Sequence, residues 1–138
     1  MRSLAFVAVF ALASPALADD NVAGTYDVKL DETASTCDPK PETLSKGKLA
    51  ITVKKTVVTV RLDKMFPMTG ELKDGSISAK TTKIIGTAVM GLSARYSVAG
   101  HVDATGAVDL VLTAQYIRQD NNKPHCAQAW KVTGTRTK

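Results

Sequence analysis

The chain has few of the residues from which catalytic and metal sites are built. Its 138 residues include two cysteines, two histidines and one tryptophan, and 5% of them are aromatic. Two cysteines alone cannot complete a tetrahedral zinc site, and His101 lies at a distant turn, on a different predicted strand from the one that begins at Cys126 next to His125. Neither a phosphate-binding loop nor a Ser–His–Asp set can be assembled from the sequence. We therefore expect no enzyme activity, no cofactor and no metal.

Aromatic residues are also missing from between the basic residues. The chain has a formal net charge of +5, and its lysines and arginines are scattered along it. A groove for single-stranded nucleic acid combines positive charge with aromatic side chains on which bases stack. We therefore interpret the basic residues as a solvated face and expect no nucleic-acid partner. A weak attraction to an anionic surface or an acidic partner stays open.

Long apolar runs are absent except near the N-terminus. Residues 4–13 form an apolar core that follows Arg2 and is too short for a stable bilayer-spanning anchor, and residues 16–18 (Ala-Leu-Ala) fit the small-x-small cleavage pattern. We predict a signal peptide at 1–18 and a single β-barrel domain at 19–138, with a retained N-terminal anchor as the alternative. The expected location is periplasmic or secreted, in a bacterium, and the mature chain is not expected to span a membrane.

Helical periodicity is absent from the mature chain, and alternation with a period of two takes its place. The stretch 92–116 alternates apolar and polar residues on both sides of a short loop at 103–106, which contains a glycine. This pattern is typical of a β-hairpin that is half-buried along both strands. Shorter segments repeat it, so we predict eight strands in all. They cover residues 23–30, 47–53, 56–63, 69–73, 76–82, 92–102, 107–116 and 126–136.

Eight consecutive antiparallel strands form an up-and-down meander, which either closes into a barrel or leaves two edges. Cys37 follows the first strand and Cys126 begins the last, at the same rim, so a disulfide between them would join the two ends of the sheet. An isolated cysteine pair in an exported protein is most simply one disulfide. The predicted fold class is therefore all-β, an eight-stranded antiparallel up-and-down β-barrel with a Cys37–Cys126 disulfide.

The connections between the strands predict two unlike rims. Tight turns are expected at residues 54–55, 74–75 and 103–106, all at one rim, and longer loops at residues 31–45, 64–68, 83–91 and 118–124, all at the other. A barrel that is sealed at one end and framed by long loops at the other has a mouth where a ligand can enter.

Apolar residues in two of the long loops and at inward positions make this mouth a candidate ligand site. Methionine adapts its shape and is common at accommodating surfaces, and the hydroxyls of Tyr96 and Tyr116 would orient a ligand's polar end. The same side chains could instead plug the barrel, because eight strands leave an interior that side chains can fill. Both interpretations stay open. The candidate ligand-binding residues are Phe66, Met68, Ile85, Met90, Tyr96, Tyr116 and Trp130.

The two ends of the mature chain carry a short motif. Gly24-Thr25-Tyr26 opens the first predicted strand and Arg136 closes the last. With a disulfide at the mouth, this resembles the lipocalin and calycin plan, in which a Gly-x-Trp on the first strand packs its ring under a late arginine. Here Tyr26 replaces the tryptophan, and the helix that follows the lipocalin barrel is absent. The resemblance implies a small-molecule carrier for apolar compounds. Avidin shares the meander, but its pocket needs several tryptophans.

Two functional hypotheses are carried forward. The first is an exported small β-barrel that binds an apolar or amphipathic small molecule at its long-loop end. The alternative is a protein-interaction or inhibitor module, for example a protease or lysozyme inhibitor, that uses the same loops. An outer-membrane barrel would need apolar residues outside, and the outward positions of Lys29, Lys48 and Arg61 argue against it. The identity of the ligand or partner and the oligomeric state are left open.

Overall fold

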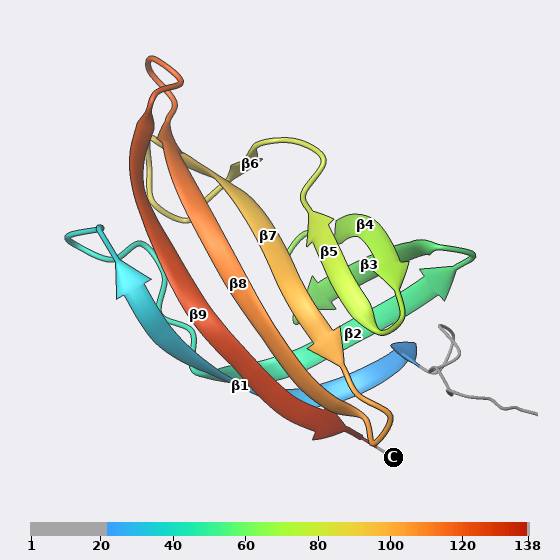
Figure 1. The fold of residues 1–138 in the computed structure, drawn as a ribbon. Helices are drawn as coiled ribbons and strands as arrows, with labels where there is room; N and C mark the ends of the chain where they lie inside the picture. Colours follow the sequence, from blue (N-terminus) through green and yellow to red (C-terminus); the bar gives the residue numbers. More distant parts are fainter. Residues whose placement is uncertain (1–21, 138) are drawn as a thin grey trace, which may run out of the picture.

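The structure, a computed structural model, describes residues 22–137. The predicted signal peptide at 1–18 lies outside the described residues. No helix within the described range is long and apolar enough to cross a membrane. The strands found in that range, labelled in Figure 1, are β1 (Gly24–Ser35), β2 (Lys46–Lys54), β3 (Val57–Leu62), β4 (Met68–Lys73), β5 (Ser76–Lys80), β6 (Ile85–Gly86), β7 (Leu92–Val102), β8 (Ala107–Arg118) and β9 (Pro124–Arg136).

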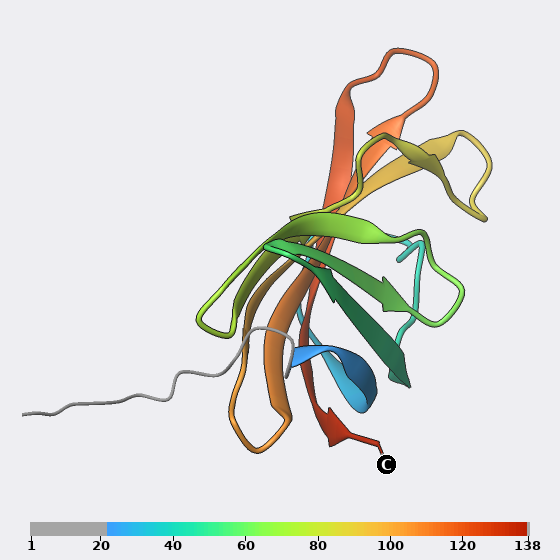
Figure 2. The same ribbon diagram turned by 90° about the vertical axis from the view of Figure 1, so that its right-hand side faces the viewer.

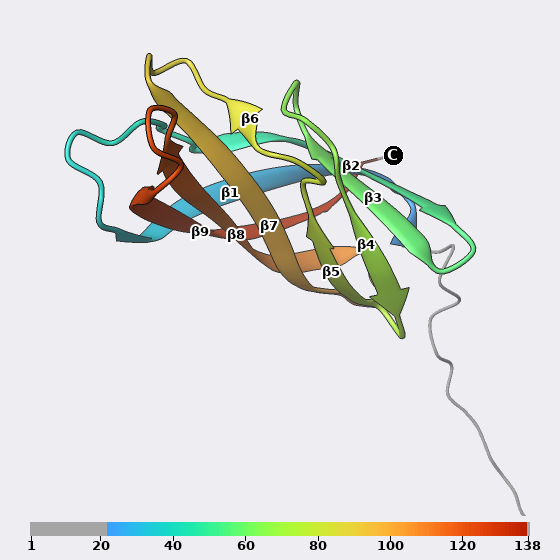
Figure 3. The same ribbon diagram turned by 90° about the horizontal axis from the view of Figure 1, so that it is seen from above.

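Hydrogen bonds between neighbouring strands join the sheet into a ring. The strand order is β5-β4-β3-β2-β1-β9-β8-β7-β6, and an additional antiparallel pairing between β5 and β7 closes it. Figures 2 and 3 show the sheet bending back on itself around an interior. The first strand pairs with the last, from Tyr26 opposite Arg136 to Ser35 opposite Gln128. The predicted all-β class, the antiparallel pairing and the closure are confirmed by this barrel-like arrangement.

Two details differ from the sequence prediction. β1 runs on to Ser35 instead of ending at residue 30, because it continues to pair with β9 through a bulge between Glu32 and Ala34. The pairing of β1 with β2 ends at Lys29, so the rest of β1 covers less apolar surface. Its sequence therefore lacks the alternation of apolar and polar residues. β6 lies in a segment that the sequence predicts as a loop. Its two residues pair with Ala94 and Ser93, and a strand of this length is too short to produce an alternating pattern.

The core fills the interior of the ring with the inward residues of every long strand. In β9, Trp130 is 1% exposed, and in β1 Tyr26 is fully buried. Burying a large apolar side chain contributes roughly 1.5 to 3 kcal/mol, so these positions dominate the stability of the sheet. The largest fully buried side chains of the described residues are those of Trp130, Tyr26, Tyr116, Ile51, Met68, Leu110, Leu112 and Gln128.

Tight turns occupy one rim, as predicted. Asp74 and Gly75 both have positive φ, 52° and 81°, which a two-residue type I′ hairpin requires and which Asp-Gly adopts readily. In the β7–β8 turn, one carboxylate oxygen of Asp103 accepts hydrogen bonds from the Thr105 hydroxyl and from the N–H groups of Thr105 and Ala107. The Thr105 hydroxyl is the largest cause of the lowered pKa of Asp103. The turn is thereby fixed by its own side chains.

Two contacts hold the seam between β1 and β9. At one end, the Arg136 guanidinium lies 5.4 Å from the centre of the Tyr26 ring and donates a hydrogen bond of 2.9 Å to its hydroxyl. At the other, Cys37 and Cys126 form the predicted disulfide, with an S–S distance of 2.04 Å. A disulfide is compatible with an oxidising, exported location.

Candidate functional site

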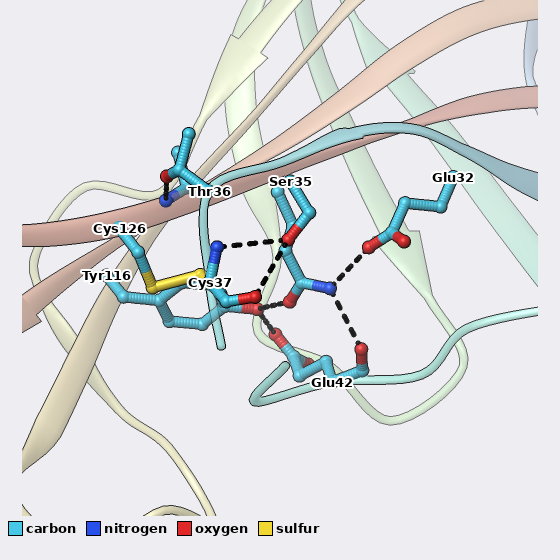
Figure 4. Close-up of a disulfide and its surroundings, with 9 residues drawn as sticks. Glu32, Ser35, Thr36, Cys37, Glu42, Tyr116 and Cys126 are labelled. Carbon is cyan, nitrogen blue, oxygen red and sulfur yellow. Dashed lines mark hydrogen bonds between the residues drawn. A yellow bond between two sulfur atoms is a disulfide. The ribbon is translucent and has the colours of Figure 1, made fainter. Parts of the chain in front are cut away.

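The segment between β1 and β2, residues 36–45, contacts the inward face of the sheet at the long-loop end. We call it the strap. The disulfide at Cys37 ties its beginning to β9, and the N–H of Thr36 donates to the carbonyl of Ala127 at 2.9 Å. At its other end, the carbonyl of Ser45 accepts from the N–H of Leu30. Both ends of the strap are thereby tied to the sheet, and Figure 4 shows the side chain of Glu42 directed from the strap toward Tyr116.

Glu42 is the strap residue that brings a charged group to the inward face, whereas Cys37 and Leu44 of the strap pack against the apolar core. One of its carboxylate oxygens, Oε2, accepts hydrogen bonds from the hydroxyls of Tyr96 at 2.6 Å and Tyr116 at 2.8 Å. Tyr96 comes from β7 and is 7% exposed, and Tyr116 comes from the neighbouring β8 and is fully buried. The strap therefore supplies a carboxylate to a pair of tyrosines that the strands hold in place.

Gln128 of β9 connects this carboxylate to a second one. Its side chain is 1% exposed. The amide nitrogen Nε2 donates to Oε2 of Glu32 at 2.6 Å and to the backbone carbonyl of Glu42 at 3.0 Å, while Oε1 accepts from the Tyr116 hydroxyl at 2.7 Å. Every polar atom of the amide has a partner, as a buried amide requires. Lys40 of the strap forms an ion pair with Glu32, which anchors the strap from the solvent side.

The electrostatics of this network keep the tyrosines protonated. Burial raises the pKa of Tyr96 far above its ordinary value, and the hydrogen bond and negative charge of Glu42 raise it further. The same causes, with burial again the largest, raise the pKa of Tyr116. The hydrogen bond from Lys40 lowers the pKa of Glu32, followed by that from Gln128. At neutral pH the inward face thus presents two hydroxyl donors to an acceptor.

A cleft of about 630 Å³ lies beside the strap, between three loops. Its walls mix apolar side chains with positively charged ones, and Arg118 is paired with Asp120 at 2.9 Å. Sites for small molecules are commonly roughly 300 to 1,000 Å³ and mainly apolar, with a few polar groups. The lining residues are Pro39, Lys40, Pro41, Val89, Met90, Gly91, Leu92, Arg118, Gln119, Asp120 and His125.

A second cleft, of about 560 Å³, lies on the outer face of β7, β8 and β9 near the disulfide. Arg95 and Gln115, which face outward, stand opposite each other in the register of β7 and β8 and form part of its floor. Ile84 and Pro124 border it. It shares only His125 with the first cleft, so the two are separate surfaces at the same end of the molecule.

The structure distributes the predicted ligand-binding residues over several environments. Met90 is 98% exposed and lines the cleft beside the strap. Met68 and Trp130, each 1% exposed, belong to the packed core. Phe66 is 57% exposed on the β3–β4 loop, which does not line that cleft. Ile85 is half-buried in β6. The set is therefore not one continuous surface, and the role of each member in binding stays a prediction.

The inward positions of Tyr96 and Tyr116 were predicted from the sequence, whereas their hydrogen-bond partners Glu42 and Gln128 were not. Tyr96 and Tyr116 do meet at one polar point, the Glu42 carboxylate, and their role in orienting a ligand stays a prediction. Glu42 lies in a loop with no repeating pattern, and nothing in the sequence indicates which loop residue turns inward. Gln128 had a signal, because it alternates with Trp130 and Val132 on the inward face of β9. A polar residue in such a series indicates a buried polar partner.

The described residues do not form a metal site: no three His, Cys, Asp or Glu side chains among them gather closely enough to hold an ion. The network offers hydrogen-bond donors and carboxylates, and the cleft offers an apolar surface with basic groups at its edge. Comparison of the chain with protein-family models, with curated proteins and with solved structures gives no match.

Proposed function

We propose that this protein binds an amphipathic small molecule in the cleft beside the strap, at the long-loop end. The observation that carries the proposal is the cleft itself, about 630 Å³ between three loops. Its apolar walls, which include Val89, Met90 and Leu92, suit the chain or ring of such a ligand. Lys40 and Arg118, each also paired with a carboxylate, supply N–H donors for its polar end. Methionine at an accommodating surface supports a ligand of adaptable shape.

The seam between the first and last strands supports a lipocalin-like or calycin-like relationship. The contact between Arg136 and the ring of Tyr26 is the arrangement that the resemblance implies for a first-strand aromatic and a late arginine. Such a protein would act in the periplasm or outside the cell, and the Cys37–Cys126 disulfide supports this location. Under this proposal the ligand site is displaced from the ring's interior, which Trp130 and its neighbours fill, to the rim.

Titration with anilinonaphthalene sulfonate, an anionic amphipathic fluorophore, tests the proposal. We expect saturable binding to the wild type and a loss of affinity of about tenfold for Val89→Ser combined with Met90→Ser, since losing one to two buried methylene contacts costs roughly 1 to 2 kcal/mol. Phe66→Ser is the matched control, because Phe66 is equally an exposed apolar loop residue but does not line the cleft. Equal affinity in the wild type and the double variant would contradict the proposal.

A second function is favoured by one specific observation. Met90 and Phe66 are large apolar side chains that are 98% and 57% exposed on two different loops. A contiguous exposed apolar patch marks a protein-binding surface, so this alternative requires the two loops to present both residues to one partner. A protein-interaction or inhibitor module predicts that a partner captured from extracts is lost when both Met90 and Phe66 are replaced by serine. A small-molecule site predicts that Phe66→Ser has no effect on binding.

A further inference from the structure

The two tyrosine hydroxyls on the inward face converge on a single carboxylate oxygen. Tyr96 and Tyr116 lie on adjacent strands, where each pairs with an alanine of the other strand, Ala114 and Ala94, so that their side chains share one face. Both side chains are buried and are therefore held by packing. The oxygen that they bind, Oε2 of Glu42, belongs to a segment without regular structure. The receptor is thus rigid, and the group bound to it is carried by a loop.

A count of hydrogen atoms shows that Glu42 is held incompletely. Tyr116 has one hydroxyl hydrogen but two acceptors within reach, Glu42 Oε2 at 2.8 Å and Gln128 Oε1 at 2.7 Å. The amide of Gln128 cannot turn over to donate instead, because its nitrogen already donates to Glu32 and to the Glu42 carbonyl. The carboxylate therefore has one undivided hydrogen bond, from Tyr96, and shares the other. Another carboxylate could replace it without loss of any bond within the sheet.

The tyrosine pair is connected to the cleft of the proposed function along the chain, although neither tyrosine nor Glu42 lines that cleft. Pro41, which precedes Glu42, is part of the cleft wall. On the opposite wall, Leu92 is two residues before Ala94, the register partner of Tyr116. Lys40 and Arg118 also line the cleft, where each is already paired with a carboxylate, that of Glu32 and that of Asp120. For a molecule whose apolar chain lies in the cleft, the path to the tyrosine hydroxyls leads past the Glu42 side chain, which covers them.

We infer that the hydroxyls of Tyr96 and Tyr116 are the head-group site for a ligand that ends in a carboxylate, and that Glu42 occupies this site as an internal competitor. The ligand class is a monocarboxylate with an apolar chain. Binding displaces the Glu42 side chain, and the strap stays attached through the disulfide at Cys37. The inference rests on the proposed function, because it takes the cleft as the place of the apolar chain.

The test compares dodecanoate with dodecanol, which have the same chain and differ in the head group. Calorimetry on Glu42→Ala is expected to show at least tenfold tighter binding of dodecanoate than the wild type and unchanged binding of dodecanol. Adding Tyr96→Phe and Tyr116→Phe to Glu42→Ala should remove the gain. Glu71→Ala, which removes an exposed glutamate of β4, is the matched control and should bind as the wild type does.

Three results would overturn the inference. The first is no increase in dodecanoate affinity in Glu42→Ala, and the second is an equal increase for dodecanol. The third is an increase in dodecanoate affinity that persists when both tyrosine hydroxyls are removed. Glu42→Gln keeps the size of the side chain and guards against misfolding. It should tighten the binding of dodecanoate, but not of dodecanol, by less than Glu42→Ala does. Unchanged dodecanoate affinity in Glu42→Gln counts equally against the inference. Failure of the cleft proposal looks different. In that case Val89→Ser with Met90→Ser leaves dodecanoate binding unchanged, whatever Glu42→Ala does.

Discussion

Tyr96 and Tyr116 illustrate how single residues set the chemistry of this molecule. Each is a buried apolar ring with one polar atom that must find a partner, and both find Glu42. The partner is negatively charged and the surroundings are poorly solvated, so ionisation of either hydroxyl would place two negative charges side by side. The raised pKa of both tyrosines is the physical consequence.

We expect the stability of the protein to fall with rising pH above the ordinary tyrosine pKa of about 10, faster than in a Tyr96→Phe/Tyr116→Phe variant. In the unfolded chain both hydroxyls lose their protons there, whereas in the folded protein, where their pKa is raised, they keep them. The stability contributed below pH 10 is therefore lost at up to about 1.4 kcal/mol per pH unit for each tyrosine. Urea unfolding at a series of pH values measures the slope.

The comparison uses slopes rather than absolute stabilities, because the variant also lacks hydrogen bonds worth about 1 kcal/mol each. All other ionisable groups are the same in the two proteins, so their contribution to the slope cancels. Parallel stability curves for the wild type and the variant would show that the tyrosines ionise as freely in the folded protein as in the unfolded chain.

At the scale of strands, close contact between neighbours is what lets the sheet curve into a ring. Gly134 in β9 lies between Val28 of β1 and Val108 of β8. A Cβ atom added there would lie 2.0 Å from the carbonyl oxygen of Asp27 and 2.8 Å from the Cα of Val28. Only glycine allows this approach, and glycines at such points commonly mark where a strand bends.

Gly134→Ala is therefore expected to destabilise the protein by about 1 to 3 kcal/mol, the usual cost of forcing extra atoms into a packed position. Gly86→Ala in β6 is the matched control, because a Cβ there meets nothing within 4 Å. Its effect should stay within about 0.5 kcal/mol. Urea unfolding followed by Trp130 fluorescence measures both. Equal stabilities of the two variants would mean that β1 and β9 separate at no cost.

The strands were predictable wherever one face of the strand is buried, because burial of one face produces an alternation of apolar and polar residues in the sequence. The hairpin of β7 and β8 was recognised because Tyr96, Val98, Leu110 and Leu112 all point into the core. The end of β1 was missed because a strand held by backbone hydrogen bonds to one neighbour needs no apolar side chains. The strap was assigned correctly as irregular, but its polar contact with the inward face depends on one residue, Glu42. Tertiary position decides that contact, and local pattern does not encode it.

At the scale of the whole molecule, the ring depends on the seam between its first and last strands. Its contacts join residues that are far apart in the sequence, so closing it costs more chain entropy than any hairpin does. The disulfide reduces that cost, since Cys37 and Cys126 are 89 residues apart and remain linked in the unfolded chain. The contact between Tyr26 and Arg136 at the other end of the seam lacks this advantage and breaks on unfolding.

Replacing both cysteines with alanine should therefore lower the free energy of unfolding by about 4 to 5 kcal/mol, the loop-closure estimate for a cross-link of this span. The wild type treated with a reducing agent controls for the packing lost at Cys37, which is buried. Amide hydrogen exchange adds a local measurement, because the strap loses its covalent tie while the far end of the seam keeps the Tyr26–Arg136 contact. We expect exchange to rise first in residues 36–45. A decrease in the free energy of unfolding below about 1 kcal/mol, with unchanged amide exchange, would mean that the contacts of Lys40, Glu42 and Gln128 are sufficient to hold the strap. The disulfide would then not contribute to closure of the ring.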